Sequence, residues 1–293
     1  MRALHLVDGT YELFRAHFSK RPSHVTPGGW EAKATVGVVS SLLQLLHDPQ
    51  ENVTHLAVAF DNPIRSFRNQ LFAGYKTEEG VPPELLAQFD PVEEAVRSLG
   101  GVVWSMKELE ADDALATAAA RFADQVDQVR ILTPDKDLGQ CVVGKRVVQV
   151  DRMRQKVIDE EALFALRGVR PESIPDWLAL IGDSADGIPG LPGFGEKTAA
   201  TLLCHYRHLE SIPDDAARWE VKVRGAERLA ATLAERRADA MLYRTLATLR
   251  RDVPLAEDLE ALRFRGVPKE RFFAWCDKLG VNTLRARPTR WEG

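Results

Sequence analysis

Acidic residues recur in this chain where strands would end and helices would begin. Apolar runs lead directly into three of them, at Leu-His-Leu-Val-Asp8, Leu-Ala-Val-Ala-Phe-Asp61 and Val-Arg-Ile-Leu-Thr-Pro-Asp135. The whole set comprises Asp8, Asp61, Glu110, Asp112, Asp113, Asp135, Asp137, Asp183 and Asp186. If the runs are neighbouring parallel strands, we expect the carboxylates to meet at one sheet edge, where open α/β sheets bind their ligands.

Such a cluster of carboxylates is electrostatically costly. Two unit charges about 4 Å apart repel by roughly 4 kcal/mol at an effective dielectric constant near 20. We therefore expect that the cluster persists only if it is protonated or holds metal cations, and hard oxygen ligands select Mg²⁺ or Mn²⁺. A pair of metal ions that clamps the attacking and leaving oxygens of a phosphate needs many carboxylates from several segments. The pattern thus indicates metal-assisted chemistry on phosphate.

The spacing of the acids suggests how they are presented. Asp135 and Asp137 are two residues apart, which would place them on the same side of an extended segment. Asp183 and Asp186 are three residues apart, which would place them on one helix face.

A simpler interpretation exists for each acid taken alone, namely a solvated surface residue. For Glu110, Asp112 and Asp113 the alternative is capping of the helix that follows, because carboxylates are favoured at helix N-termini.

Apolar runs and helical patterns alternate along the first half of the chain. Strands are predicted at residues 3–7, 55–60, 102–104, 129–133 and 147–150, and helices at 34–46, 91–99 and 111–126. This order predicts an α/β domain over residues 1–151, with a mostly parallel sheet covered on both faces. Residues 152–293 read as helical, and segments 19–30 and 75–83 read as loops that could carry function.

A glycine- and proline-rich stretch from Gly187 to Lys197 has the character of a helix-hairpin-helix element within residues 176–204. Its glycines would let the backbone approach a phosphate, and the next helix would offer free N–H groups. Contacts of this kind grip a duplex without reading its sequence. The alternative is a tight helix–helix connection. The DNA-binding candidates are Gly187, Gly190, Gly193, Gly195, Lys197 and Thr198.

Aromatic and basic residues supply further candidates. Tyr75 could stack on a base, and Lys76 could polarise a scissile phosphate. Arg15, Arg65 and Arg68 are either phosphate contacts or ordinary surface charges.

Composition excludes several classes of protein. The 293 residues are enough for one large domain or two smaller ones. No apolar run approaches the ~20 residues that a membrane span needs, and the N-terminus lacks a signal-peptide pattern. We therefore expect a cytoplasmic protein. The three cysteines fit neither a disulfide framework nor a zinc site.

The net charge of −4 is unevenly distributed. Residues 187–293 hold 19 basic and 15 acidic residues, a net of +4, so residues 1–186 hold 20 and 28, a net of −8. Without the nine clustered acids, the first part would be close to neutral. Overall acidity therefore does not exclude a nucleic-acid partner.

Taken together, the motifs resemble those of the bacterial and phage 5′-nuclease family: flap endonucleases and the 5′→3′ exonuclease domain of DNA polymerase I. The resemblance runs from Leu6 to Leu255. Its strongest parts are Glu110-Ala111-Asp112-Asp113, Asp135-Lys136-Asp137, Gly182-Asp183-Ser184-Ala185-Asp186-Gly187-Ile188-Pro189-Gly190, Gly193-Phe194-Gly195-Glu196-Lys197-Thr198-Ala199 and Leu246-Ala247-Thr248. The joint match is specific, whereas any one part alone would be weak.

The resemblance implies a resolvase- or PIN-like fold and a function. The family cuts DNA phosphodiester bonds near 5′ ends at flaps, nicks and branches, using Mg²⁺ or Mn²⁺. The nine acids match its metal-site acids. Arg15, Arg68, Tyr75 and Lys76 match its active-site basic and stacking positions. Residues 187–197 match its helix–three-turn–helix element, which binds duplex DNA and often a K⁺ ion. No polymerase sequence follows, so the chain resembles a stand-alone version, which we expect to be a monomer.

Three positions depart from the family pattern. Glu79 stands where Tyr-Lys-x-x-Arg has arginine, with Glu78 beside it. Pro134 replaces the glycine before Asp-Lys-Asp, and Gln70 replaces a common glutamate. These changes motivate an alternative, a branched-DNA-binding protein that has lost useful catalysis. A metal-dependent phosphatase or RNase on a similar sheet is a third hypothesis, but small substrates would need no duplex grip.

Overall fold

The computed structural model describes residues 2–293, which form two compact units. Unit 1 consists of Met1–Arg65, Glu78–Thr133 and Arg251–Gly293, and unit 2 of Ser66–Thr77 and Pro134–Arg250. No helix among the described residues is long and apolar enough to span a membrane.

Unit 1 contains a parallel sheet. Its strands are β1 (Ala3–Asp8), β2 (His55–Asp61), β3 (Val102–Met106) and β4 (Gln128–Leu132), paired in the order β3-β2-β1-β4. Every residue of β1 and β2 is buried, as expected for parallel strands with helices on both faces. The prediction of a mostly parallel α/β sheet is confirmed.

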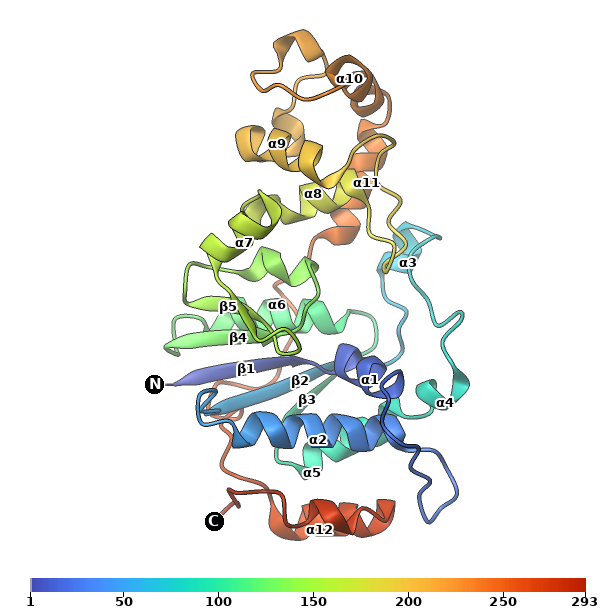
Figure 1. Cartoon of the computed structure of the whole chain (residues 1–293), viewed down its shortest axis with the longest axis vertical. Coiled ribbons are helices and arrows are strands. Elements are labelled where there is room, and N and C mark those ends of the chain that lie inside the picture. The colour runs from blue at the N-terminus through green and yellow to red at the C-terminus, as the bar shows by residue number, and fades with distance from the viewer. Residues whose placement is uncertain (1) are drawn as a thin grey trace. The chain divides into compact units, whose positions relative to one another are not determined.

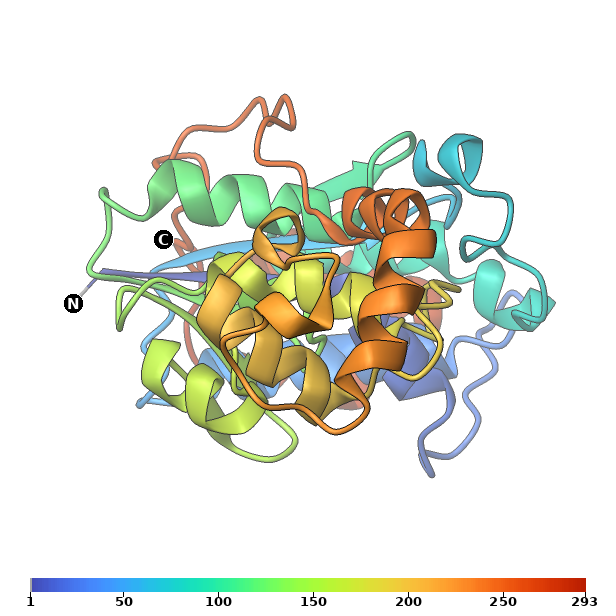
Figure 2. The ribbon, with the colours of Figure 1, turned by 90° about the horizontal axis from the view of Figure 1, so that it is seen from above.

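Helices cover this sheet on both sides. The helices of unit 1 are α1 (Gly9–His17), α2 (Lys33–His47), α4 (Pro83–Leu86), α5 (Phe89–Ser98), α6 (Ala111–Phe122) and α12 (Lys269–Leu279), with a 3-10 turn, η5 (Asn282–Leu284). Helix α6 lies on one side of β1 and β2 and α2 on the other (Figure 2). Helix α12 packs beside α5 (Figure 1). The expected helices at 34–46, 91–99 and 111–126 correspond to α2, α5 and α6.

Unit 2 is mainly helical. It contains α3 (Arg68–Leu71), α7 (Glu160–Arg167), α8 (Ile174–Ile181), α9 (Glu196–Tyr206), α10 (Ala226–Glu235) and α11 (Arg237–Ala247). The short elements are η1 (Asp137–Cys141), η2 (Pro171–Ser173), η3 (Leu209–Ser211) and η4 (Ala216–Arg218), and an antiparallel pair, β5 (Val147–Asp151) and β6 (Lys156–Ile158). Strand β6 was not expected, because we read the chain after Asp151 as helical throughout.

The compact units do not follow the predicted cut between residues 151 and 152. The C-terminal segment belongs to unit 1, where the Phe264 backbone N–H donates to the Thr54 carbonyl at 2.9 Å. The loop that contains Tyr75 belongs to unit 2. Both segments join their unit through contacts between residues that are far apart in sequence. Composition and hydrophobic periodicity do not reveal such contacts.

Candidate active site

Five of the nine acids lie in unit 1, at the carboxyl ends of β1 and β2 and at the start of α6. Asp8 ends β1 and caps α1: its carboxylate accepts from the Tyr11 N–H at 2.8 Å and from the Thr133 hydroxyl at 2.9 Å. Asp61 ends β2 and accepts from the Ala111 N–H at 2.7 Å. These hydrogen bonds hold both buried carboxylates at the sheet edge, as the strand pattern predicted.

The acids that begin α6 also have a structural role. Glu110 and Asp113 form a capping box, in which the Asp113 carboxylate accepts from the Glu110 N–H at 3.0 Å. The capping interpretation is therefore correct for this pair, which is buried. Asp112 lies in the first turn and is partly exposed. Capping fixes where the carboxylates lie, and a carboxylate that accepts one hydrogen bond keeps further lone pairs for a second ligand.

The other four acids lie in unit 2, and their local geometry differs from the prediction. Asp135 and Asp137 are not in an extended segment: Lys136 has helical dihedrals, and the Asp137 N–H donates to Asp135 at 2.9 Å. Asp183 and Asp186 are not on a helix face, because α8 ends at Ile181. Gly182 takes φ of 83°, which ends the helix and starts a turn closed by two bonds between Asp183 and Ile188.

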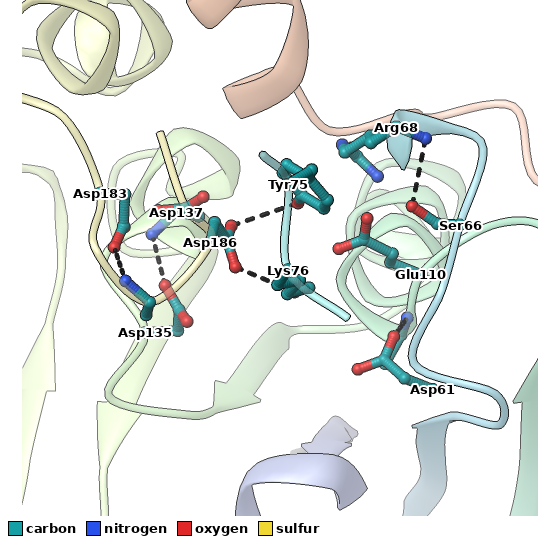
Figure 3. Close-up of polar contacts among 12 residues, drawn as sticks. Asp61, Ser66, Arg68, Tyr75, Lys76, Glu110, Asp135, Asp137, Asp183 and Asp186 are labelled. Atoms are coloured by element: carbon teal, nitrogen blue, oxygen red, sulfur yellow. Dashed lines mark hydrogen bonds and ion pairs between the residues drawn. The ribbon is translucent and has the colours of Figure 1, made fainter. Parts of the chain in front are cut away.

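Two lysines neutralise part of this charge. The Lys76 ammonium pairs with Asp186 at 3.0 Å, and the Lys136 ammonium pairs with Asp183 at 3.0 Å. Figure 3 shows Lys76 and Tyr75 pointing toward Asp186. We expected only protonation or cations to make the acids compatible, and this was wrong, because the chain also supplies its own ammonium groups.

Burial dominates the electrostatics of the Asp135–Asp137 pair. Burial raises the pKa of Asp135, and the charges of Asp186 and Asp183 add to this effect. Burial, followed by the charge of Asp135, raises the pKa of Asp137 well above its ordinary range. Oδ1 of Asp137 is buried without a hydrogen-bond partner among residues 2–293. A buried carboxylate oxygen of this kind is suited to a cation.

The donor set fits a hard divalent cation, although no ready-made cage is present. Within residues 2–293, no three His, Cys, Asp or Glu side chains are gathered closely enough to hold an ion as they stand. In unit 2, lysine ammonium groups occupy places between carboxylates. All candidate ligands are oxygens, and one of them lacks any partner, which is the chemistry that Mg²⁺ and Mn²⁺ prefer.

The predicted basic and aromatic residues have unequal access to a substrate. The Tyr75 ring is only 3% exposed, and its hydroxyl donates to Asp186 at 3.3 Å, so it is packed in the core of unit 2 and not offered for stacking. Arg68 is fully buried and donates to the carbonyls of Leu246 and Thr248 at 2.7 and 3.1 Å. In unit 1, Arg15 pairs with Glu12.

Arg68 explains the Leu246-Ala247-Thr248 motif. Together with Gln140, whose amide donates to the Ala247 carbonyl at 3.0 Å, it satisfies three successive carbonyls at the end of α11. The family resemblance predicts an active-site position for Arg68, and the structure adds a structural reason for an arginine there.

Glu78, the acid beside the departure at Glu79, has a partner. The Arg65 guanidinium Nε donates to Glu78 at 3.1 Å within unit 1, which reduces the negative charge that this glutamate presents.

The glycine-rich stretch connects α8 to α9 as a hairpin. The Leu191 N–H donates to the Leu180 carbonyl at 2.8 Å, and α9 begins after Gly195. Gly187 and Gly190 have positive φ, and a side chain there would meet backbone at 2.1 and 2.4 Å. These two glycines are therefore required by packing.

The remaining DNA-binding candidates in the hairpin are at least partly exposed to solvent. Gly193, Gly195 and Lys197 are exposed, and Thr198 is partly exposed.

Sequence reasoning missed two residues around the acids. Thr133 donates to Asp8, and Lys136 pairs with Asp183. The position of Lys136 between two aspartates was a usable signal, whereas the Thr133 contact depends on the pairing of β1 with β4.

Comparison with known proteins defines the class. Residues 3–168 match the model of the 5′-3′ exonuclease N-terminal resolvase-like domain, and residues 169–270 match that of the 5′-3′ exonuclease C-terminal SAM fold. The chain therefore belongs to the 5′-3′ exonuclease family.

Among curated relatives, the chain is similar to two DNA polymerases I. It is 34% identical to that of Bacillus caldotenax over 289 residues, covering 97% of this chain and 32% of the relative. It is 38% identical to that of Pseudomonas aeruginosa over 273 residues, covering 90% and 29%. The chain thus spans about a third of the length of these relatives.

Solved structures support the fold. T5 5′-exonuclease with bound divalent zinc ions has a TM-score of 0.64 at 18% identity, covering 84% of this chain and 89% of that one. The catalytic core of Rad2 in complex with a DNA substrate has a TM-score of 0.60 at 14% identity, covering 95% and 87%.

Proposed function

We propose that this chain is a divalent-metal-dependent 5′→3′ exonuclease and flap endonuclease that hydrolyses DNA phosphodiester bonds near 5′ ends. The observation that carries the proposal is the group of acids in unit 2, in which Asp137 and Asp183 are buried and Asp186 pairs with Lys76. Family membership supports it, and so do a solved neighbour with bound zinc ions and another in complex with a DNA substrate.

Both sets of acids would take part in holding the ions. We assign two Mg²⁺ or Mn²⁺ ions to Asp8, Asp61, Glu110, Asp112, Asp113, Asp135, Asp137, Asp183 and Asp186. When bound, such ions stabilise the charge that develops on the attacking and leaving oxygens. The orphaned Oδ1 of Asp137 and the raised pKa of that carboxyl are what a metal would relieve, because a cation favours the ionised form.

Lys76 would change partners during the reaction. Its ammonium is committed to Asp186 at 3.0 Å in the described structure. A cation at Asp186 would cancel that attraction and let Lys76 turn to the scissile phosphate, where a positive charge stabilises the transition state. Tyr75, buried and bonded to Asp186, would position this segment. Arg15 would orient Glu12, and Arg68 would orient the carbonyls of Leu246 and Thr248.

The hairpin between α8 and α9 would hold the duplex. Exposed Gly193, Gly195 and Lys197 and partly exposed Thr198 lie where α9 offers free N–H groups to a phosphate. Gly187 and Gly190 would shape the loop, whose carbonyls could bind K⁺. We also propose that the chain acts as a monomer, and the cytoplasmic location expected from the sequence stays a prediction.

The test is cleavage of an end-labelled 5′-flap substrate with Mg²⁺, with Mn²⁺ and with EDTA. We expect cutting in either metal, none in EDTA, and a loss of at least about 100-fold in Asp61→Asn and Asp135→Asn. Exposed Glu161→Gln serves as the matched control, with unchanged cleavage expected. If both acids act in the same step, the double variant should lose no more activity than the worse single variant.

Two outcomes would overturn the proposal. Tight flap binding without cleavage in any divalent ion would favour the alternative of a DNA-binding protein. Cleavage unaffected by Asp135→Asn would remove the acids of unit 2 from the mechanism.

A further inference from the structure

An arginine that the proposed function does not use lies near the acids of unit 2. Arg167 is the last residue of α7, which ends there because Gly168 takes φ of 72° and donates its N–H to the Phe164 carbonyl at 2.8 Å. Within residues 2–293, the Arg167 side chain makes no ion pair and no hydrogen bond, and its Nε is buried without a partner. A guanidinium carries five N–H donors, so this is an unusual accumulation of unused donors.

Trp177 holds this side chain in place. The guanidinium carbon lies 5.4 Å from the centre of the Trp177 ring, which is a cation–π contact. Trp177 is buried in α8, and its indole N–H donates to the Glu196 carbonyl at 3.3 Å, in the first turn of α9. Arg167 therefore packs against a side chain that also contacts the start of α9, the second helix of the hairpin.

The charges around Arg167 are negative. The carboxylates of Asp135, Asp137, Glu196 and Asp183 all act electrostatically on the guanidinium, although none forms an ion pair with it. A cation near several carboxylates that bonds to none of them is available to a further anion once those carboxylates are neutralised. Since its partly exposed side chain is stacked in advance, Arg167 would lose little rotamer freedom on binding.

We propose that Arg167, stacked on Trp177, binds a backbone phosphate of the DNA strand between the acid cluster and the start of α9. The proposal rests on the proposed function, which makes DNA the ligand. The planar fork of N–H donors on a guanidinium matches the oxygens of a phosphate. Divalent cations at the acids would strengthen the contact, since the carboxylates would no longer compete for the guanidinium.

The experiment measures binding of fluorescent 5′-flap DNA by anisotropy over a range of KCl concentrations, in EDTA and again in Ca²⁺. Arg167→Gln should weaken binding about 3- to 10-fold in Ca²⁺, with a smaller loss in EDTA, and lower the salt slope by about 1. Arg167→Lys, which keeps the charge, should retain the slope. Arg170→Gln removes an exposed arginine three residues away and should leave affinity in Ca²⁺ within about 2-fold of the wild type.

The outcomes separate a binding role from a structural one. If Arg167 only covers Trp177, Arg167→Gln will lower the Tm but keep the wild-type affinity and salt slope, and the proposal fails. If Arg167→Gln does not fold, Arg167→Lys decides: loss of the planar guanidinium fork should weaken flap binding in Ca²⁺ while the slope is retained, and an affinity equal to that of the wild type would overturn the proposal.

The same preparations distinguish this proposal from the proposed function. Wild-type protein that binds flap DNA through Arg167 but leaves it uncut in Mg²⁺ would contradict only the nuclease activity.

Discussion

Replacing Asp137 with asparagine should stabilise the metal-free protein while impairing metal binding. The change keeps the shape of the side chain but removes one buried charge beside Asp135, whose oxygen lies 2.9 Å from the Asp137 backbone nitrogen. Two carboxylates about 5 Å apart repel by about 3 kcal/mol at an effective dielectric constant near 20. Attraction to Lys76 offsets part of this, so we expect a gain of about 1–3 kcal/mol in unfolding free energy.

The gain should depend on pH in a defined direction. The pKa of Asp137 in the folded protein lies well above its ordinary value of 3.8, so the folded state binds the proton more tightly than the unfolded state. The resulting stability is fully present below pH 3.8 and is lost as the pH rises through the folded-state pKa. Asparagine does not titrate, so the advantage of Asp137→Asn should grow from acidic to neutral pH.

Thermal unfolding of wild type, Asp137→Asn and the control Glu161→Gln in EDTA measures this directly. Each kcal/mol should shift the Tm by about 2–4 °C. Added Mg²⁺ should raise the Tm of the wild type and have a smaller effect on Asp137→Asn. A variant that is less stable than wild type in EDTA at neutral pH, or equally responsive to Mg²⁺, would refute the reasoning.

Three further predictions follow from the described contacts. Lys76→Met should lower single-turnover flap cleavage by about 100- to 1,000-fold with little change in DNA affinity, and equal loss of affinity would contradict the assigned role. Gly187→Ala should lower the unfolding free energy, measured by chemical denaturation, by about 2–4 kcal/mol, because the residue has φ of 74° and its new methyl would lie 2.1 Å from the Gly74 carbonyl oxygen. Glu51→Gln should lower the unfolding free energy at neutral pH by about 2–3 kcal/mol, since the hydrogen bond from His5 and the pairing with Arg130 lower the pKa of Glu51 to about 2. Chemical denaturation over a range of pH measures this difference. That contribution should be present above pH 4.5 and lost as the pH falls through about 2, and a pH-independent difference would count against it.

The parallel sheet was predictable because its strands are continuous apolar runs. The runs that end at Asp8 and Asp61 correspond to β1 and β2 within one residue at their ends. Helix α1 was missed, since Asp8 was interpreted only as a ligand although it also caps the helix. The close approach of α1 to β2 depends on packing, because a side chain at Gly9 would meet the Phe60 ring at 2.5 Å.

The sequence indicates which acids are candidates for the site, but it did not predict their local geometry. Spacing suggested a shared helix face for Asp183 and Asp186, but the positive φ of Gly182 places them in a turn. The pairing of Asp186 with Lys76 depends on the return of the segment around Lys76 to unit 2. Such tertiary contacts carry no periodic signal in the sequence.

Titration with Mn²⁺, followed by the electron paramagnetic resonance signal of the free ion, tests most directly whether the acids bind metal. We predict that the wild-type protein binds about two ions, and that Asp135→Asn and Asp61→Asn each weaken or remove binding while Glu161→Gln does not. Equal Mn²⁺ binding by the wild type and both aspartate variants would contradict the account.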